Sequence, residues 1–382
     1  MEEKTMMIAA HYLIALIKCA LHGQTIDHGP DGCQYEDIWR LAENNGVEAI
    51  SYMGFAPEFE PKTIKKWKES VNVTLFRQIS FDGEREQILE KLEEAEVCYM
   101  PLKGILIQDY YRRPGMRLMA DNDILYGGPD LSEEQILETQ KKVIQIMQGL
   151  GYEIESLKGN HDAFLKEPCF NFELHRHLMD YNNPMRLYYD GVWDRAVVEK
   201  ENPYHYQMTD EDEYIYFMAH AFKHFDLAGC GIRPLIDLYV MLEKKQDMDW
   251  KYIANELQTL GMTAFEQQLK KLSMHCFSEG ELDEADEKLL FFMLGCGTYG
   301  NLDVKVDQSL QKLSEDGNAH AKAKYFKQRF FLSPELCRSY FPFFYKHRWL
   351  IWLLPFYRLG RGLVRHPAVL WREFRKVCRS NK

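Results

Sequence analysis

The sequence predicts an α+β fold, with a small mixed-sheet core flanked by helical regions on its N-terminal and C-terminal sides. Residues 83–200 alternate helix-like and strand-like patterns in the order αβαβαβββ, which is typical of a mixed sheet. Residues 1–82 and 201–337 show helical periodicity, and residues 338–382 form a basic aromatic tail. A chain of 382 residues is also too long for one ordinary core. We therefore expect four regions with these boundaries.

Hydrophobic periodicity and stop signals define the expected elements in order. The first helix pattern ends at Gly23, and Ser132 is a candidate N-cap for a helix in the core. The expected helices cover residues 6–22, 34–54, 61–81, 84–97, 105–113, 132–151, 211–226, 232–245, 249–261, 263–277 and 283–295. The expected strands cover residues 98–104, 117–126, 152–156, 161–166 and 169–178.

The charge, the cysteines and the N-terminus argue against several classes of protein. A net charge of −11 gives no overall basic bias toward nucleic acid. The nine cysteines are scattered without a CxxC pair, which favours reduced thiols in a cytoplasmic protein over a disulfide framework or a zinc site. The N-terminus has no positive leader and no window holds 18 uncharged apolar residues, so we expect neither a signal peptide nor a transmembrane segment.

Two aspartates, Asp121 and Asp123, lie two positions apart in the otherwise apolar run "RLMADNDILY". On a strand these positions point to the same face, where two like charges repel one another. A divalent cation between them removes that repulsion, and Mg²⁺ (or Mn²⁺) prefers oxygen ligands. We therefore predict a metal site here, and the alternative is a solvated strand edge.

A third carboxylate is needed for two-metal phosphoryl transfer, and Glu173 is the candidate. In "FNFELHRHL" it alternates with apolar residues, which predicts that it shares the polar face of a strand with His175 and His177. The alternatives are a structural salt bridge between Glu173 and Arg117, and zinc binding by the two histidines.

Cations suited to a triphosphate occur at the turn that follows the first core strand. Lys103-Gly104 supplies a lysine and a helix N-terminus, which attracts anions. Arg117, four residues before Asp121, is placed to meet the same phosphates. The alternatives are a surface role for Lys103 and an ion pair between Arg117 and Asp121.

Three further polar residues, His220, Lys223 and His224, have the i, i+3, i+4 spacing of one helix face. We predict that this face lines a cleft against the nucleotide, and the alternative is a partly buried polar face. Arg233 and Asp237 lie four residues apart, and we expect them to form an ion pair.

Several motifs carry a resemblance to a known family. "PLKG", a helix containing "YY" and "PGMRLMADNDILY" resemble the uncharacterised nucleotidyltransferase family of the polymerase-beta superfamily, whose pattern is LKG, a helix, then R-x-M-x-D-x-D-[IL]-L. "FNFELHRHL" is similar to its E-x-H strand, and "YFMAHAFKHF…IRPLIDLYVML" to its H-x-x-K-H…R-x-x-x-D segment. The resemblance covers about residues 85–365. The chain departs from it where Lys103-Gly104 replaces the usual glycine-glycine or glycine-serine turn.

The resemblance implies a metal-dependent nucleotidyltransferase that moves a nucleoside monophosphate from a triphosphate such as ATP to a hydroxyl acceptor. It implies that two Mg²⁺ ions are held by the catalytic residues Asp121, Asp123 and Glu173. The residues expected to bind the nucleotide are Lys103, Gly104, Arg117, His220, Lys223 and His224. The acceptor stays open, and the replaced phosphate turn leaves an alternative: a catalytically inactive module that binds a nucleotide or a partner on the same scaffold.

The tail, residues 338–382, has eleven Lys and Arg against one acid, Glu373. Its net charge of +10 leaves −21 on the rest of the chain, and five aromatic residues, Trp349, Trp352, Phe356, Tyr357 and Trp371, lie among the basic ones. We expect the tail to dock on the acidic body. Contact with an anionic membrane surface or with nucleic acid is the alternative, although prolines and glycines divide the tail into short pieces.

Overall fold

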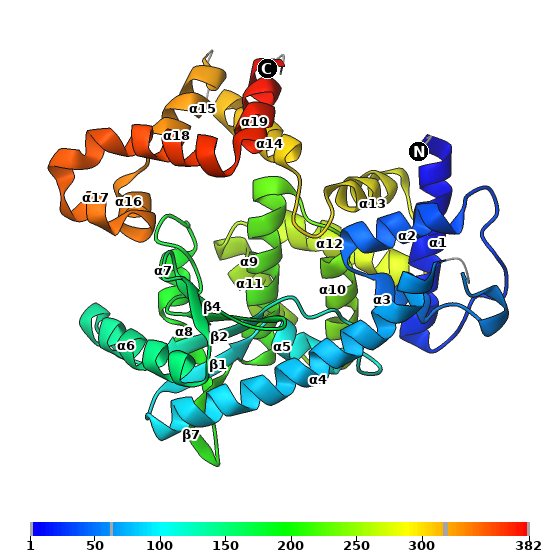
Figure 1. Cartoon of the computed structure of the whole chain (residues 1–382). Coiled ribbons are helices and arrows are strands. Elements are labelled where there is room, and N and C mark those ends of the chain that lie inside the picture. The colour runs from blue at the N-terminus through cyan, green and yellow to red at the C-terminus, as the bar shows by residue number, and fades with distance from the viewer. Residues whose placement is uncertain (1–2, 62–63, 316–319, 380–382) are drawn as a thin grey trace.

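The protein is built from one seven-stranded sheet and the helices around it, and the computed structural model describes residues 3–61, 64–315 and 320–379 (Figure 1). The predicted α+β class is confirmed. The strands are β1 (Cys98–Leu102), β2 (Asn122–Gly127), β3 (Glu153–Ser156), β4 (His161–Lys166), β5 (Phe170–His175), β6 (Val197–Glu199) and β7 (Asn202–Gln207).

Helices make up most of the remaining chain. The α-helices are α1 (Glu3–His22), α2 (Tyr35–Asn45), α3 (Glu48–Tyr52), α4 (Lys65–Glu94), α5 (Gly104–Ile107), α6 (Glu133–Gly149), α7 (Arg186–Asp190), α8 (Val192–Arg195), α9 (Asp210–Ala228), α10 (Arg233–Lys244), α11 (Trp250–Thr259), α12 (Thr263–Phe277), α13 (Glu284–Cys296), α14 (Leu302–Glu315), α15 (Ala321–Phe330), α16 (Pro334–Tyr340), α17 (Pro342–Lys346), α18 (Leu354–Arg365) and α19 (Pro367–Arg379). The 3-10 helices are η1 (Pro57–Phe59), η2 (Gln108–Tyr110) and η3 (Arg348–Leu353).

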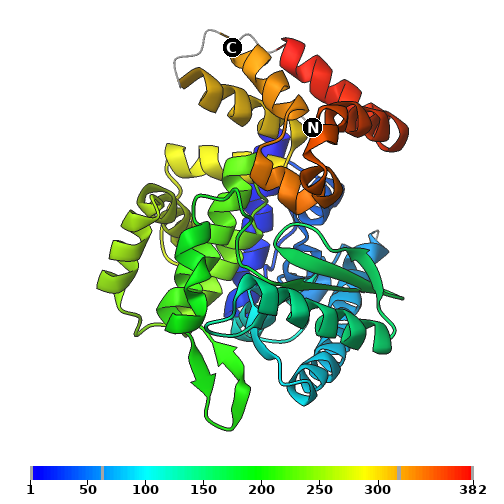
Figure 2. The same ribbon diagram turned by 90° about the vertical axis from the view of Figure 1, so that its left-hand side faces the viewer.

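The sheet is mixed, with the strand order β3-β4-β5-β2-β1-β7-β6. The pairs β2–β5 and β1–β7 are parallel, and the other neighbours are antiparallel. The hairpin β6–β7 was not predicted, and the expected boundary at residue 200 falls inside it. Its short edge strand of three residues carries too weak an alternating pattern to be seen in the sequence. In Figure 2 the hairpin projects from the end of the molecule opposite the C-terminal helices.

Helices α4 and α6 cover one face of the sheet. Ile124 and Leu174 pack on that side, in a core with Phe81 and Leu92 of α4 and Val143 of α6. Because side chains alternate along a strand, the intervening positions of β2 and β5 face the opposite side, toward α9 and α10. The helical covering of one face therefore determines which residues are free to build a site on the other.

One helix, α4, stands where two were expected, over residues 61–81 and 84–97. It runs unbroken from Lys65 to Glu94. The expected boundary at residue 82 falls inside it, and residues 62–63 of the expected helix lie outside the described part of the chain. Gly83 does not break the helix, since it lies on an exposed face where nothing packs against it.

The N-terminal and C-terminal helical regions share one core, which includes Leu13 of α1, Ile236 of α10 and Leu269 of α12. By length and composition, residues 4–22 of α1 are apolar enough to cross a membrane, with a mean hydropathy of 1.4. Half of that stretch is buried, against α2, α3 and α12, so core packing accounts for much of its apolar surface.

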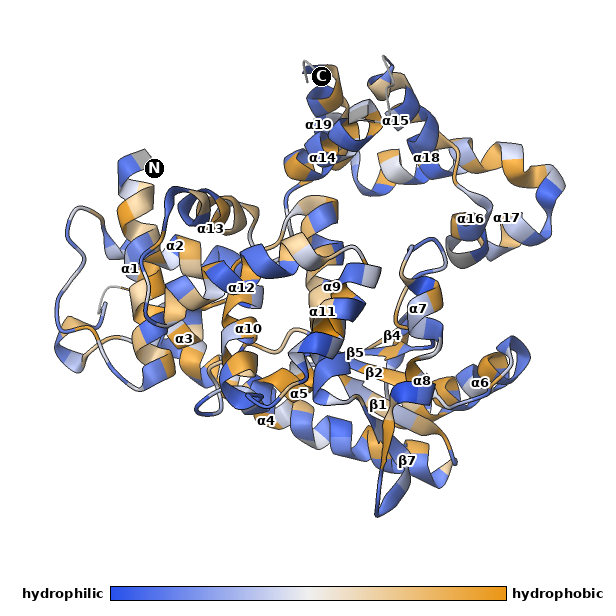
Figure 3. Cartoon of the chain, turned by 180° about the vertical axis from the view of Figure 1, so that it is seen from behind, coloured by the Kyte–Doolittle hydropathy of each residue, from blue (hydrophilic) through white to orange (hydrophobic). Residues whose placement is uncertain are grey.

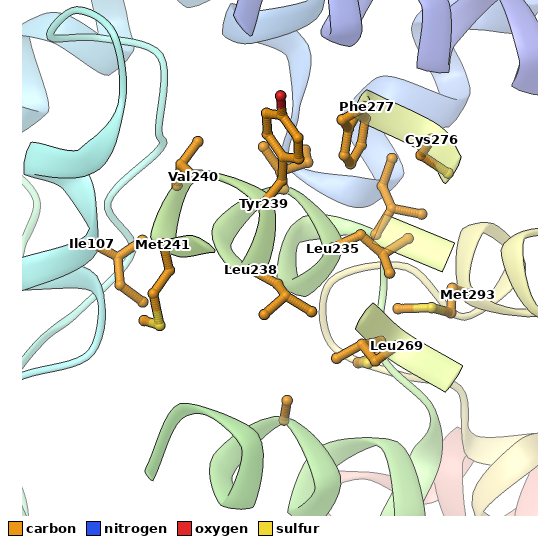
Figure 4. Close-up of a cluster of buried hydrophobic side chains, with 14 of the residues drawn as sticks. Ile107, Leu235, Leu238, Tyr239, Val240, Met241, Leu269, Cys276, Phe277 and Met293 are labelled. Carbon is orange, nitrogen blue, oxygen red and sulfur yellow. The ribbon is translucent and has the colours of Figure 1, made fainter. Parts of the chain in front are cut away.

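Helix α10 is held on several sides, as the close-up in Figure 4 shows. Leu235 and Leu238 are fully enclosed, and Met241 lies beside Ile107 of α5, next to the sheet. Phe277 of α12 packs against the other side of the helix. Large buried side chains of this kind give α10 a fixed position, so the polar residues on its remaining face are fixed as well.

The tail folds into four short helices and one 3-10 segment at one end of the molecule (Figures 1 and 3). Val377 of α19 is buried against α14, and Arg372 pairs with Asp303 of α14 at 2.7 Å. The tail therefore docks on the acidic body through α19, as expected. Its tryptophans stay exposed, Trp349 by 73% and Trp352 by 63%. Lys382 lies outside the described residues.

Candidate functional site

A cavity of about 380 Å³ lies between the sheet and helices α9 and α10. Every residue predicted for the site lines it: Lys103, Gly104, Arg117, Asp121, Asp123, Glu173, His220, Lys223 and His224. These residues come from five segments separated by up to 121 positions in the chain, so the fold brings the predicted set together. Their roles stay predictions.

The sheet wall of the cavity carries the acidic residues. Asp123 of β2 and Glu173 of β5 are register partners on adjacent parallel strands, so their side chains emerge next to each other. Asp121, just before β2, lines the same cavity, as its two-residue spacing from Asp123 predicts. Sheet register therefore sets the spacing of the carboxylates.

Lys103 is not a surface lysine, because its side chain is only 16% exposed and its ammonium lies 2.8 Å from Oδ1 of Asp123. Lys103 lies at the turn between β1 and α5 with a positive φ of 52°, a backbone conformation that residues other than glycine rarely adopt. The following helix has four residues, not the expected nine, and continues as the 3-10 turn η2. A Cβ at Gly104 would lie 2.6 Å from Nη1 of Arg117, so a side chain there would require the Arg117 guanidinium to shift.

Two histidines lie beside the carboxylates. Nε2 of His175 lies 2.7 Å from Oδ1 of Asp123 and 3.7 Å from Oε2 of Glu173. Nε2 of His161, on β4, lies 3.7 Å from the same Glu173 oxygen. His177, expected on this face, is elsewhere: β5 ends at His175, and the His177 ring lies 3.6 Å from Asp190. The predicted zinc alternative through His175 and His177 is therefore wrong.

Arg117 forms a buried two-point ion pair with Asp237 of α10, at 2.9 and 3.0 Å. The expected pairing of Arg233 with Asp237 is therefore wrong, and so are the alternatives that paired Arg117 with Asp121 or Glu173. Asp237 also accepts a hydrogen bond from the hydroxyl of Tyr111 at 2.7 Å. This pair joins the helical region to the segment that leads into β2.

Arg233 lines the cavity without that partner. Its Nε is buried and has no hydrogen-bond partner among the residues that the structure describes. Lys223 of α9 also lines the cavity, and no ion pair of its ammonium is found within the described ranges. The helical wall of the cavity thus holds two cations that are free to meet an anion.

The comparisons with known proteins bear on this cavity. The model of the family described as "Uncharacterised nucleotidyltransferase" matches residues 31–278, about two thirds of the chain. The chain belongs to that family. No curated protein matches this nucleotidyltransferase-family chain.

One solved structure is similar to part of it: the crystal structure of an antigenic nucleotidyltransferase-like protein from Paracoccidioides brasiliensis. It shares 16% sequence identity and a TM-score of 0.30, over 56% of this chain and 95% of that one. A similarity at that level is too low to support a conclusion about chemistry.

The two neighbouring carboxylates of this family member have opposite pKa shifts. Burial raises the pKa of Asp123, but the Lys103 ammonium and the His175 ring outweigh it, and the pKa lies well below its usual range. Burial and then repulsion by Asp123 raise the pKa of Glu173 to about 7. Asp123 is thus ionised, with its charge balanced by Lys103 and His175, whereas the charge of Glu173 is only partly balanced, which favours a cation beside it.

The helical wall shows the reverse shifts, because its groups are cationic. Burial, followed by repulsion from Arg117, lowers the pKa of Arg233. Burial also lowers the pKa of Lys223, and it lowers the pKa of His224 to about 4 with help from Lys223. Charges that the fold disfavours are typical of groups that a ligand will neutralise.

Three of the cavity residues that were not predicted from the sequence show why they were missed. His161 opens the strand "HDAFLK", and its spacing from Glu173 gives no hint of contact because β4 and β5 meet only through the register of the sheet. Arg233 was assigned to Asp237, a pairing that helix spacing favours. Tyr299 lies in the turn between α13 and α14 and is 91% exposed at the cavity, where only the tertiary fold places it.

Proposed function

We propose that the chain is a metal-dependent nucleotidyltransferase that moves a nucleoside monophosphate from a triphosphate to a hydroxyl acceptor. The observation that carries the proposal is the opposite charge of the two cavity walls. Carboxylates of Asp121, Asp123 and Glu173 gather on the sheet wall, and two cations without an ion pair in the described part of the chain, Lys223 and Arg233, lie on the helical wall. A nucleoside triphosphate with its metal needs both kinds of partner.

The donor set fits the implied metal. Three carboxylates supply the oxygen ligands that Mg²⁺ or Mn²⁺ prefers, and the raised pKa of Glu173 indicates a negative charge without a full counter-charge. Bound metal would lower the pKa of the acceptor hydroxyl and neutralise the polyphosphate.

The chain's own residues would position the reactants. Lys223 and Arg233 would bind the β- and γ-phosphates and hold the triphosphate along the helical wall. Lys103 would keep Asp123 ionised and fixed in place, through its 2.8 Å ion pair. The acceptor oxygen then bonds to the α-phosphorus, the bond from that phosphorus to the pyrophosphate oxygen breaks, and the hydroxyl proton passes to solvent.

The direct test is pyrophosphate release from each of the four nucleoside triphosphates, ATP included, with Mg²⁺ or Mn²⁺ and a panel of hydroxyl acceptors. We expect release that needs the metal and that Asp121→Asn and Asp123→Asn abolish while circular dichroism stays unchanged. Release that survives both substitutions would count against the proposal.

A second candidate is a non-catalytic module that binds a nucleotide or a partner. Its support is the Lys103 ammonium, which already occupies one oxygen of Asp123, together with the single short turn of α5 in place of a longer phosphate-binding helix. Calorimetry separates the two proposals. Nucleotide binding that is indifferent to divalent metal, with no pyrophosphate release, supports the second.

A further inference from the structure

Three side chains at the β4–β5 end of the cavity converge on one point. A ligating nitrogen of His161, one of His175 and an oxygen of Glu173 all lie within 4.8 Å of one another. We propose that these three residues form a cation site for a transition-metal ion such as Mn²⁺, with two imidazole nitrogens and one carboxylate oxygen as ligands. This inference goes beyond the proposed function, since it assigns an ion that needs no nucleotide to be bound.

The sheet builds this cluster directly. β4 and β5 are antiparallel, and His161 and His175 are register partners across them. Glu173 lies two residues from His175 on the same strand face and opposite Ala163, whose small side chain leaves the space above it open. Ligands on paired strands are held more precisely than ligands on loops.

The distances suit an ion better than a direct hydrogen bond. Oε2 of Glu173 lies 3.7 Å from Nε2 of His161 and 3.7 Å from Nε2 of His175. Both separations are too long for a hydrogen bond. A first-row ion that lies about 2.0–2.2 Å from each ligand fits between atoms at this spacing.

The orientation of the His161 ring supports the same assignment. Nδ1 of His161 lies 3.3 Å from Oδ1 of Asn160, which can accept its proton and so leave the lone pair of Nε2 directed at Glu173. An outer partner of this kind is a common feature of histidine metal sites. The amide NH2 of Asn160 lies 3.4 Å from Nδ1 of His175, which places the His175 proton on Nε2, where it is donated to Asp123 at 2.7 Å. An ion at this site therefore takes the place of that proton.

The ligand chemistry separates this site from the aspartate pair. Mg²⁺ prefers oxygen ligands only, whereas imidazole nitrogens suit first-row transition metals. Oδ1 of Asp123 is engaged by the Lys103 ammonium at 2.8 Å and by the same nitrogen of His175 at 2.7 Å, so it is not counted among the ligands of this ion. The cavity therefore has an oxygen-only end at Asp121 and a nitrogen-containing end at His161, with Glu173 between them.

Manganese alone, without nucleotide, is the probe for the test. The full chain is stripped of metal, titrated calorimetrically with Mn²⁺ and with Mg²⁺, and examined with Mn²⁺ by pulsed electron paramagnetic resonance. We expect one site that binds Mn²⁺ at least about tenfold more tightly than Mg²⁺, with nitrogen coupling from directly bound imidazole. His161→Ala and the milder His161→Gln should each weaken Mn²⁺ binding by about 10–100-fold or more and reduce the coupling.

His177→Ala is the matched control, because that imidazole is similarly enclosed but faces Asp190 outside this cavity. It should leave Mn²⁺ binding unchanged. Absence of nitrogen coupling, or coupling that survives both His161→Ala and His175→Ala, would overturn the inference.

The outcome is separable from that of the transfer reaction. Nitrogen-coupled Mn²⁺ without pyrophosphate release in any assay would uphold this site and count against the proposed function. Mg²⁺-dependent pyrophosphate release without nitrogen coupling would support the proposed function and count against this site.

Discussion

The two walls of the cavity obtain their chemistry in different ways. On the sheet wall, Asp123, Glu173, His161 and His175 lie within a few ångströms of one another because strand register places them there. On the helical wall, Lys223 and Arg233 stand on separate helices, and hydrophobic packing under each helix fixes their positions.

The difference concerns neutralisation as well as geometry. On the sheet wall, the negative charge of Asp123 is balanced from within the chain by the Lys103 ammonium and the His175 ring. On the helical wall, Nε of Arg233 is buried without a hydrogen-bond partner, and neither Arg233 nor Lys223 has an ion pair among the described residues. A dense acidic cluster favours an ion, and separated free cations favour an extended anion, so each wall predicts a different partner.

The largest effect should come from removing a charge on the sheet wall. Asp123→Asn keeps the shape but removes the carboxylate that the proposed metal needs, so we expect pyrophosphate release to fall by on the order of 10³-fold. The rate is measured at saturating nucleotide, with His177→Ala as the control that keeps its activity. An Asp123→Asn variant within tenfold of the wild-type rate would show that this wall does not carry the chemistry.

The connection between the walls is the next most sensitive point. Asp237→Asn leaves the buried guanidinium of Arg117 without its counter-charge, so we expect a loss of about 3–5 kcal/mol in the free energy of unfolding. Denaturant unfolding measures it. Lys288→Ala, which breaks an exposed pair with Glu284, is the control and should cost less than about 1 kcal/mol. Equal losses in the two variants would contradict a special role for the buried pair.

The sheet wall was the more predictable of the two. Asp121, Asp123 and Glu173 could be identified because acids in apolar strand patterns are rare and a two-residue spacing puts two of them on one face. The cap of α6 was also predictable, since Ser132 accepts a hydrogen bond from the Gln135 backbone in a capping box. Local rules of this kind act within one element.

The remaining features depended on contacts between distant elements. His161 joins the acidic cluster through cross-strand register, and Arg117 pairs with Asp237 across 120 positions of the chain. Helix spacing favoured Arg233, four residues before Asp237, for that pairing. Asp237 instead pairs with Arg117, which comes from another segment and makes two contacts with the carboxylate. The two helices expected over residues 61–81 and 84–97 left Gly83 between them, but an exposed glycine in a long helix is tolerated, and α4 runs through it.

A smaller effect should follow from changes on the helical wall. Arg233→Gln removes one charge-assisted contact to the phosphates, so we expect the KM for the triphosphate to rise about tenfold with kcat nearly unchanged. The fold should not suffer, because burial and repulsion by Arg117 already disfavour that charge. Lys223→Gln is expected to behave in the same way, and the exposed Lys288→Ala is the control. A fall in kcat at constant KM would instead place Arg233 in the chemical step.

Close to neutral pH, the smallest effect should be the pH dependence of Glu173, whose pKa of about 7 lies above the ordinary value of 4.5. The folded protein holds this proton more tightly than the unfolded chain, so the stability it contributes is complete below pH 4.5 and is lost as the pH rises through about 7. Activity should run the other way, since a metal ligand must be deprotonated, and the rate should fall about tenfold per pH unit below the midpoint. Because metal and proton compete for the same oxygens, raising the metal concentration should move the midpoint of the pH–rate profile to lower pH. A midpoint that stays in place at every metal concentration would separate Glu173 from the metal.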